Sequence, residues 1–474
     1  MKLRRVWAAA ISVVVSVGSV GSAHAVPTGQ ADTRPNVIVF MTDDQNVASL
    51  QVMSSVRTLL AQQGVTFTNN FTSYPLCCPS RATYLTGQYP HNHGVLWNAA
   101  PDGGYYKLRG NETIPVWMSR AGYQTAHIGK YLNGYGTQDP LEIPAGWGEW
   151  YGAIDPSTYR MWGYTLNENG VLRTYGQDNV EDPALYQTDV YRAKAVNYIN
   201  RKAPGGPFFL SVATLAPHIE VGYALNNGNR NPRPAPRHRG TFDTVALPKP
   251  PAFNEADVSD KPAHIRALPP ITAADEINMT RVYRGMLESL LAVDEAVAAM
   301  INALRNNGEL ANTVFVFTSD NGWLQGEHRI KGTKIHPYDE SSRVPLIVRG
   351  PGLAPNTQRA ASVSNVDLAA TVLDAGDATP GIVVDGRSLI PVATAARNLL
   401  IETGPRSGGE LWYAAVRSPR FLYVEYSTGE RELYDMQLDP YQLRSRHADS
   451  TYQQVILNLA AELQRLRGCA GQSC

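Results

Sequence analysis

The residues with the clearest chemical potential form the run Cys77-Cys78-Pro79-Ser80-Arg81. Proline is compatible with a first helical turn, because its missing N–H would have no helical partner there. Gly87 then provides a stop signal. The pattern predicts a short helix with Cys77 at its N-terminus, where free backbone N–H groups favour an anion. Arg81 adds a planar guanidinium suited to tetrahedral oxyanions. The alternative is a buried structural cysteine beside a helical turn.

Two predicted strands end in acidic or amide side chains. Residues 36–41 and 313–318 are continuous apolar runs, typical of strands buried in a parallel sheet. Asp43 and Asp44 follow the first run, and Asp320 and Asn321 follow the second. Open α/β sheets place their sites at the carboxyl ends of strands, so these side chains could meet. Oxygen ligands without imidazole suit a hard cation, calcium more readily than zinc. Each motif alone could instead form a turn or a helix cap.

Taken together, these motifs resemble those of the formylglycine-dependent sulfatases. The resemblance implies that Cys77, the first cysteine of its motif, is oxidised after synthesis to formylglycine, whose hydrated aldehyde is the nucleophile. It also implies a metal site made by Asp43, Asp44, Asp320, Asn321 and the residue derived from Cys77. Calcium is the first choice of ion and magnesium the second. A formylglycine-generating enzyme is the implied partner during maturation.

Three further residues acquire roles from the same resemblance. Lys130 follows a predicted strand over residues 123–128 and is the implied ligand of the sulfate. His218 follows a strand over 208–213 and is the implied proton donor to the leaving oxygen. Lys334 precedes a Tyr-Asp-Glu turn, and the resemblance implies that it contacts both the sulfate and the ester oxygen. Lys331 is a nearby competitor for that role.

The segment Gly129-Lys130-Tyr131-Leu132-Asn133 departs from the common sulfatase pattern. Many members carry a histidine two residues after the lysine, where this chain has Leu132. The form present resembles the N-acetylglucosamine-6-sulfatase branch, in which Asn133 could replace the histidine. This branch implies a sulfated carbohydrate as substrate, with small aryl sulfates as surrogates. His328 and His336 are further candidates for lining the pocket.

The remaining pattern predicts an α/β protein of the alkaline-phosphatase-like class, with a large, mostly parallel sheet sandwiched by helices. Helices are expected over residues 47–63, 113–120, 187–201 and 276–307. Short alternating strands over 412–416, 421–426 and 432–434, followed by a helix over 452–467, predict a small antiparallel sheet. We therefore expect a catalytic domain over residues 26–400 and a C-terminal subdomain over 401–474.

Residues 226–251 are rich in proline, asparagine and arginine and predict an extended excursion. Arg233, Arg237, His238 and Arg239 would suit an anionic saccharide, and a solvated loop is the alternative. Near the C-terminus, Cys469 and Cys474 could close a small disulfide loop in an oxidising compartment.

The pattern of residues 1–25 predicts a secretory signal peptide. A basic start is followed by an apolar stretch and by Ala23-His24-Ala25, a small-residue cleavage site. A membrane anchor is the alternative for this segment. The chain carries 42 basic and 42 acidic residues, a balance that does not favour nucleic acid or an anionic membrane as partner. We expect a secreted protein.

Two other functions are compatible with the motifs. The same scaffold serves phosphate and phosphonate ester hydrolases, some of which use formylglycine. A saccharide-binding protein without catalysis would result if Cys77 stayed unmodified. Relative rates on sulfate and phosphorus esters discriminate the first alternative, and the effect of Cys77→Ala on turnover discriminates the second.

Overall fold

The two apolar runs form the centre of the large sheet. Strands β1 (Asn36–Asp43) and β8 (Thr313–Ser319) are parallel neighbours, in register from Asn36 opposite Thr313 to Thr42 opposite Ser319. The acidic residues that follow each strand therefore leave the sheet at the same edge, as the sequence predicted.

The computed structural model describes residues 32–221, 231–391, 396–404 and 412–474. The predicted signal segment and residues 226–230 of the predicted excursion lie outside these ranges. Ten strands form the large sheet in the order β10-β2-β9-β8-β1-β7-β3-β4-β5-β6. The others are β2 (Val65–Phe71), β3 (Gln124–Gly129), β4 (Glu149–Ala153), β5 (Tyr164–Glu168), β6 (Val171–Tyr175), β7 (Phe208–Pro217), β9 (Leu346–Arg349) and β10 (Thr357–Ser364). The central strands β8-β1-β7-β3-β4 pair in parallel, and β9, β5 and β6 pair antiparallel with their neighbours.

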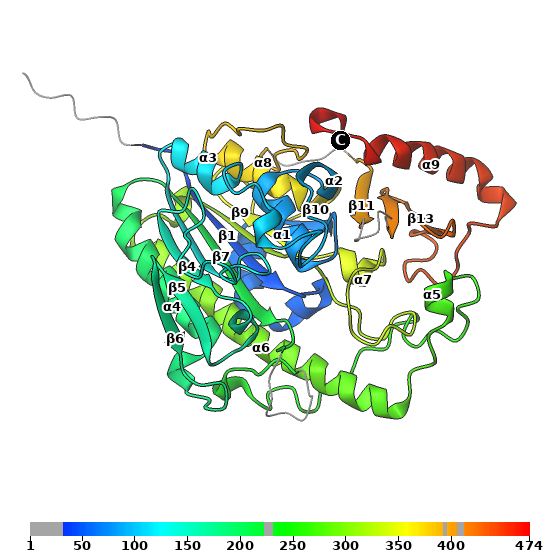
Figure 1. Cartoon of the computed structure of the whole chain (residues 1–474), viewed down its shortest axis with the longest axis horizontal. Helices are drawn as coiled ribbons and strands as arrows, with labels where there is room; N and C mark the ends of the chain where they lie inside the picture. The colour runs from blue at the N-terminus through cyan, green and yellow to red at the C-terminus, as the bar shows by residue number, and fades with distance from the viewer. Residues whose placement is uncertain (1–31, 222–230, 392–395, 405–411) are drawn as a thin grey trace, which may run out of the picture. The chain divides into compact units, whose positions relative to one another are not determined.

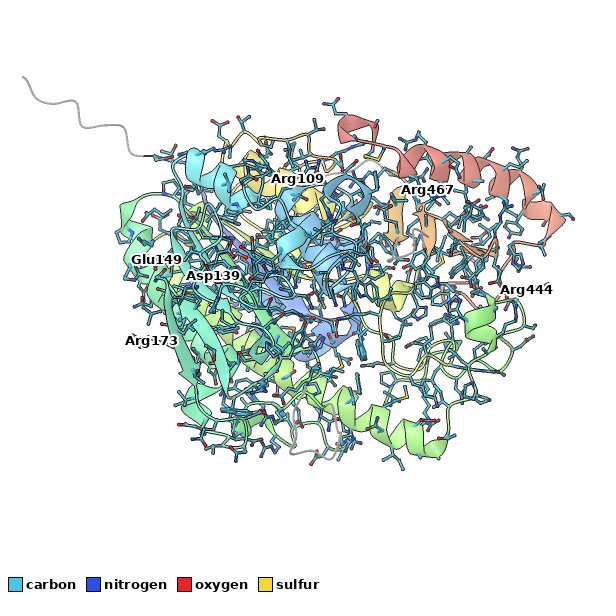
Figure 2. All side chains as sticks on the ribbon, in the orientation of Figure 1. Arg109, Asp139, Glu149, Arg173, Arg444 and Arg467 are labelled. Carbon is cyan, nitrogen blue, oxygen red and sulfur yellow. A yellow bond between two sulfur atoms is a disulfide. The ribbon has the colours of Figure 1, made fainter. Side chains whose placement is uncertain are left out.

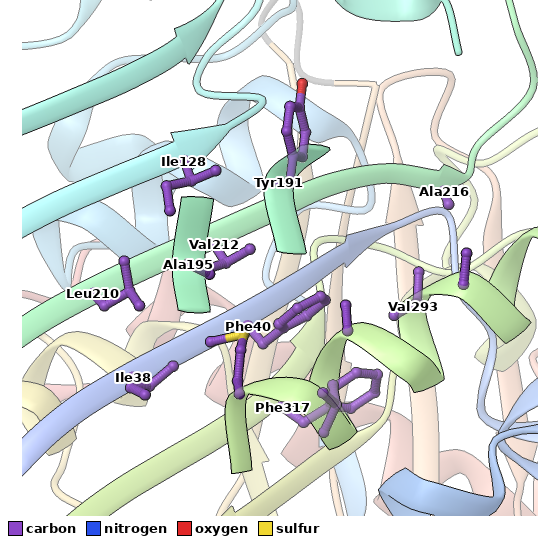
Figure 3. Packing of buried hydrophobic residues seen from close by; sticks show 14 of the residues in the cluster. Ile38, Phe40, Ile128, Tyr191, Ala195, Leu210, Val212, Ala216, Val293 and Phe317 are labelled. Atoms are coloured by element: carbon purple, nitrogen blue, oxygen red, sulfur yellow. The ribbon is translucent and has the colours of Figure 1, made fainter. Parts of the chain in front are cut away.

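Helices cover both faces of this sheet (Figure 1). Alternate residues of β1 point to opposite faces: Ile38 and Phe40 pack with α4 (Gln187–Lys202) and α6 (Ala273–Asn306), as Figure 3 shows in part. Val37 and Val39 pack on the other face with α1 (Cys77–Thr86), α3 (Ile114–Arg120) and α8 (Val366–Ala375). Both faces of β1 are therefore apolar, which explains its unbroken hydrophobic run. The predicted fold class is confirmed.

The remaining helical segments are short. Three are single α-helical turns: α2 (Pro90–His93), α5 (Ala263–Arg266) and α7 (Asp339–Ser342). Turns of 3-10 helix cover Tyr105–Lys107, Ser157–Tyr159, Pro183–Leu185, Ala203–Gly205, Pro236–His238, Leu310–Asn312, Ser450–Tyr452 and Gly471–Ser473.

The prediction of one continuous helix over residues 47–63 is wrong, because the segment is divided into short helical turns of other types. The structure has a 3-10 helix over Val47–Val52, a π-helical turn over Val56–Leu60 and a 3-10 turn over Ala61–Gln63. The backbone N–H groups of Ser55 and Val56 donate to the carboxylate of Asp294 on α6, at 2.9 and 2.8 Å. A tertiary contact that takes these two donors interrupts the helical ladder, and local periodicity cannot reveal it.

A second sheet lies at the C-terminal end of the chain. It is antiparallel, in the order β11 (Leu399–Thr403), β12 (Tyr413–Arg417), β13 (Phe421–Tyr426), β14 (Arg431–Asp435). Helix α9 (Gln453–Arg467) packs its apolar side chains on one face, and the predicted disulfide between Cys469 and Cys474 follows it. The predicted antiparallel sheet and helix are confirmed, and β11 is an additional strand.

The other face of the small sheet packs against the segment that connects β8 to α7. Leu324, Ile330 and Tyr338 of that segment share one apolar cluster with side chains of the small sheet. At its centre the buried carboxylate of Glu432 accepts hydrogen bonds from three tyrosines: Tyr338 at 3.0 Å, Tyr426 at 2.6 Å, and Tyr434. The small sheet thus supports the chain segment in which Lys334 lies.

We predict that Glu432→Leu destabilises the protein. The leucine would leave three buried tyrosine hydroxyls without their acceptor, at a cost of about 3 kcal/mol or more. Denaturant unfolding measures the change. The matched control is Glu425→Leu, which removes a partly exposed carboxylate that accepts from a single tyrosine, Tyr423. Equal stability of the two variants would contradict the role given to Glu432.

Candidate active site

Helix α1 places Cys77 at its first residue, as predicted. The helix ends at Gly87, which has φ +69°, and the Gly87 N–H donates to the carbonyl of Thr83 at 2.8 Å. The Cys77 side chain is buried, with Sγ 3.5 Å from Asp43 Oδ1 and 2.9 Å from Lys334 Nζ. The cysteine therefore lies between an acid at the end of β1 and a lysine from a distant loop.

Arg81 connects the two strand ends. Its Nε donates to Asp320 Oδ2 at 2.8 Å, and its Nη2 donates to Asp43 Oδ2 at 3.1 Å. Its Nη1 donates to the backbone carbonyl of Lys130 at 2.9 Å. All three guanidinium nitrogens thus contact the protein, so Arg81 fixes the spacing of the carboxylates in this structure.

The four residues predicted as metal ligands come together at the edge of the sheet. Asp44 adopts a left-handed conformation, with φ +64°, which is uncommon for a residue with a side chain. Its N–H donates to Asp320 Oδ1 at 3.3 Å, and its Oδ1 accepts from Asn321 Nδ2 at 2.6 Å. One potential ligand atom from each of Asp43, Asp44, Cys77 and His218 lies within 4.8 Å of the other three.

The chemistry of this donor set fits a hard divalent cation. Asp43, Asp44, Asp320 and Asn321 are completely buried. Among the residues that the structure describes, Asp44 Oδ2 and Asn321 Oδ1 are buried without a hydrogen-bond partner. Buried oxygen atoms usually have a hydrogen-bond partner. A divalent cation could take the place of that partner, because carboxylate and amide oxygens are common ligands of calcium.

Two lysines from different segments enter the same cluster. Lys130 pairs with Asp43, and Lys334 pairs with Asp44 while its Nζ lies 3.8 Å from Asp43 Oδ1. Lys331, the competing candidate, instead pairs with Asp275 at 2.7 Å on the outside of the molecule. The structure therefore brings Lys334 into the cluster and leaves Lys331 out of it.

Gly129 explains how Lys130 reaches this position. It has φ +106°, and a Cβ atom there would lie 2.0 Å from the carbonyl oxygen of Ala213 on β7. Only glycine allows β3 to approach β7 so closely immediately before the lysine. His218, delivered just beyond β7, has its Nε2 3.5 Å from Asp44 Oδ2.

The buried charges shift one another's pKa. Burial alone would raise the pKa of Asp43, but Lys130, His218, Arg81 and Lys334 outweigh it and the pKa is lowered. Burial would lower the pKa of Lys334, but its acidic neighbours raise it. Burial and then Asp43 raise the pKa of Cys77 to about 12. The surroundings therefore keep the unmodified thiol protonated at neutral pH, when it is a poor nucleophile.

This burial sets the cluster apart from the charged side chains at the surface of the molecule. Arg173, Arg444 and Arg467 are exposed, and Arg173 and Arg444 lie near the left and right edges of the view in Figure 2. Such surface charges gain little from pairing, whereas a buried charge is costly unless it is paired.

The four basic side chains of the excursion that were candidates for an anionic saccharide are all paired within the protein. These side chains pair with acids of the protein itself: Arg233 with Glu220 and Asp178, Arg237 with Asp189 and Glu295, His238 with Glu295, and Arg239 with Glu181. Arg233 is buried, so the alternative of a solvated loop does not describe it either.

The two other histidines have partners outside the carboxylate cluster. His328 Nδ1 lies 2.6 Å from Glu255 Oε2. His336 packs among aromatic rings, with its ring centroid 5.8 Å from that of His264. His336 also borders a surface cavity, shared with His264 and Arg329, that is separate from the cluster residues.

Sequence reasoning missed Tyr159. Its ring centroid lies 4.7 Å from Lys130 Nζ and 5.3 Å from the centroid of His218. Its hydroxyl accepts a hydrogen bond from Asn133 Nδ2 at 2.6 Å. It ends the 3-10 turn Ser157–Tyr159 between β4 and β5. This stretch has no recognisable motif, so no sequence signal pointed to Tyr159.

Comparison with known proteins identifies the family. The sulfatase family profile matches residues 35–378, which is most of the chain. The chain belongs to the sulfatase family. An arylsulfatase of Volvox carteri is 33% identical over 98% of this chain and 79% of its own length. The N-acetylglucosamine-6-sulfatase of Capra hircus is 31% identical over 93% of this chain and 85% of its own. This sulfatase is accordingly a sulfuric ester hydrolase.

The fold of this sulfatase is also found in solved structures. The structure of BT4656 in complex with its substrate D-glucosamine-2-N,6-O-disulfate superposes with a TM-score of 0.74 at 24% identity, covering 91% of this chain and 97% of the other. The similarity establishes the alkaline-phosphatase-like fold. Within the ranges that the structure describes, no helix combines the length and the apolar character needed to cross a membrane.

We predict that removing divalent cations with a chelator lowers the melting temperature of this sulfatase by several degrees, because a bound ion stabilises the folded state by mass action. Thermal melts with and without added calcium measure the effect. Asn321→Ala should reduce the calcium-dependent shift, whereas Asp275→Asn, which changes a partly exposed carboxylate away from the cluster, should not. An identical melting temperature in chelator and in calcium would contradict the predicted metal site.

Proposed function

We propose that this sulfatase hydrolyses sulfate monoesters of a carbohydrate resembling N-acetylglucosamine-6-sulfate, and small aryl sulfates as well, through a formylglycine formed from Cys77. The observation that carries the proposal is the meeting of Cys77 with the carboxylates of Asp43 and Asp44 and with the ammonium groups of Lys130 and Lys334. A buried site that combines several cationic side chains with a helix N-terminus is suited to binding the oxygens of a sulfate group.

Asp43, Asp44, Asp320 and Asn321, with the residue derived from Cys77, would hold the cation, calcium first and magnesium second. The unpartnered oxygens of Asp44 and Asn321 support this assignment. When bound, the ion supplies positive charge against the sulfate oxygens. Calcium is preferred because it accepts more oxygen ligands in less regular geometry than magnesium does.

The protein side chains have separate roles in the proposed reaction. Lys130 and Lys334 donate hydrogen bonds to sulfate oxygens, and Arg81 holds Asp43 and Asp320 at their spacing. The hydrated aldehyde at position 77 supplies one hydroxyl as the nucleophile and a second whose deprotonation permits release of sulfate, which a thiol cannot provide. His218 or Lys334 donates a proton to the leaving oxygen.

A cavity of about 240 Å³ supports a sugar as the leaving group. Ile219, which follows His218, and Trp323, which lies two residues after Asn321, both line it. Trp323 and Met279 offer an apolar wall, and the amide of Gln325 offers a donor and an acceptor. Aromatic and apolar surface with a few polar groups suits a sugar ring, which has an apolar face and a rim of hydroxyls.

The maturation of the chain is part of the same proposal. Residues 1–25 would direct secretion and be removed, and a formylglycine-generating enzyme would act on Cys77. We divide the mature chain into a catalytic domain over residues 26–400 and a C-terminal subdomain over 401–474. The small sheet, whose first strand begins at Leu399, lies close to this boundary.

Two measurements test the proposed reaction: the substrate preference of the native enzyme and the activity of Cys77→Ala. We expect the kcat/KM of the native enzyme to be higher for N-acetylglucosamine-6-sulfate and 4-nitrophenyl sulfate than for phenylphosphonate or phosphate esters. Cys77→Ala should lose about a thousandfold or more, because the nucleophile is absent. Cys78→Ala changes the neighbouring buried thiol and should keep activity.

Two outcomes would contradict this reaction. A clear preference for phosphorus esters would favour the phosphate or phosphonate hydrolase. Unchanged turnover by Cys77→Ala would exclude residue 77 as the nucleophile, whichever ester is preferred.

Trp323→Ala tests the sugar cavity. We predict that KM for the sulfated sugar rises about tenfold, because the apolar face of the ring loses its platform. The kcat/KM for 4-nitrophenyl sulfate should change little. Tyr441→Ala, which removes an exposed aromatic side chain away from the cavity, is the matched control. Equal effects of Trp323→Ala on both substrates would place the sugar elsewhere.

A further inference from the structure

Leu132 and Asn133 follow the proposed sulfate ligand Lys130 beyond the end of β3. Leu132 is buried in the apolar cluster on one face of the sheet and offers no polar group. Asn133 is the next residue, and its Nδ2 donates to the hydroxyl of Tyr159 at 2.6 Å. The structure thus pairs Asn133 with a side chain 26 residues away in the sequence.

The ring of Tyr159 contacts two residues of the site at once. Its centroid is 4.7 Å from Lys130 Nζ, within the range of a cation–π interaction. The same ring lies 5.3 Å from His218, at an interplanar angle of 52°. Tyr159 is only partly buried, although both of its neighbours are buried. The same ring therefore contacts both the proposed sulfate ligand and the proposed proton donor.

Further contacts fix the Tyr159 segment to the segment that carries His218. The N–H of Val221 donates to the carbonyl of Tyr159 at 3.3 Å. The N–H of Met161 donates to Glu220 Oε1 at 2.7 Å. Side-chain and backbone contacts therefore hold Tyr159 in one place relative to His218.

We propose that Tyr159, held by Asn133, is a positioning residue that sets the distance and orientation of Lys130 relative to His218. The inference rests on the proposed function, in which Lys130 binds the sulfate and His218 or Lys334 protonates the leaving oxygen.

Asn133 adds a second feature to the pair. Within the described part of the chain, its Oδ1 is buried and has no hydrogen-bond partner. The hydrogen bond from Asn133 Nδ2 to Tyr159 is therefore the contact that orients the Asn133 amide.

The pair can be tested by comparing substrates whose leaving groups differ. 4-Nitrophenolate leaves without a proton, whereas a sugar alkoxide requires one. Tyr159→Leu should lose about tenfold in kcat/KM on 4-nitrophenyl sulfate, because Lys130 loses its cation–π partner. On the sulfated sugar the loss should be about a hundredfold, because the proton donor is misplaced as well.

Conservative variants separate the ring from the hydroxyl. Tyr159→Phe keeps the ring against Lys130 and His218 and should stay within about fivefold of the native enzyme on 4-nitrophenyl sulfate. Combining Asn133→Ala with Tyr159→Phe should be no worse than Asn133→Ala alone, because both changes remove the same hydrogen bond.

Tyr175→Leu is the matched control for loss of a tyrosine near a lysine. The Tyr175 ring lies 5.4 Å from Lys194 Nζ, and this pair is not part of the site. We expect this variant to keep the native ratio of sugar-sulfate to aryl-sulfate activity.

The possible failures are distinguishable. An unchanged ratio in Tyr159→Leu, or equal damage by Tyr159→Phe and Tyr159→Leu, would overturn the inference while leaving the sulfatase reaction standing. A native enzyme that hydrolyses no sulfate ester would overturn the proposed function and this inference together.

Discussion

The structure depends on the mutual neutralisation of charges buried at the carboxyl ends of β1 and β8. Asp43, Asp44 and Asp320 supply three carboxylates there, and Arg81, Lys130 and Lys334 supply three cations. A buried charge without a partner costs several kcal/mol, so each group constrains the position of the others. Elements far apart in the sequence are therefore held in one arrangement around Cys77.

Different elements of the fold carry these charged side chains, and a local feature of each element explains the position of its side chain. The apolar faces of β1 and β8 fix their register, which brings Asp43 and Asp320 to one edge. Gly129 allows β3 to approach β7 closely before Lys130. The segment with Lys334 rests on the small C-terminal sheet through the Glu432 cluster. The small sheet thereby contributes to the geometry of a site in which none of its residues take part.

The elements that the sequence predicted best are those specified by local patterns. Strands β1 and β8 are uninterrupted apolar runs, and α1 combines Pro79 in its first turn with a stop at Gly87. Each of these signals lies within a dozen residues of chain. The pairing of the two strands then followed from the general behaviour of parallel sheets, and it brought the acidic residues together as expected.

What the sequence could not predict depends on contacts between distant segments. Asp294 breaks the helix expected over residues 47–63, and acids from several elements neutralise the arginines of the excursion. Tyr159 has no motif, and only the fold brings it beside Lys130 and His218. The proposed formylglycine at residue 77 is likewise outside the sequence, because it would form only after synthesis.

Mass spectrometry of the tryptic peptide over residues 58–81, taken from purified active enzyme, tests the central claim most directly. Fragment ions locate the change, because the peptide contains both Cys77 and Cys78. The account predicts that an aldehyde has replaced the thiol at position 77, while the thiol at position 78 is intact. An enzyme that hydrolyses sulfate esters with an unmodified thiol at position 77 would contradict it.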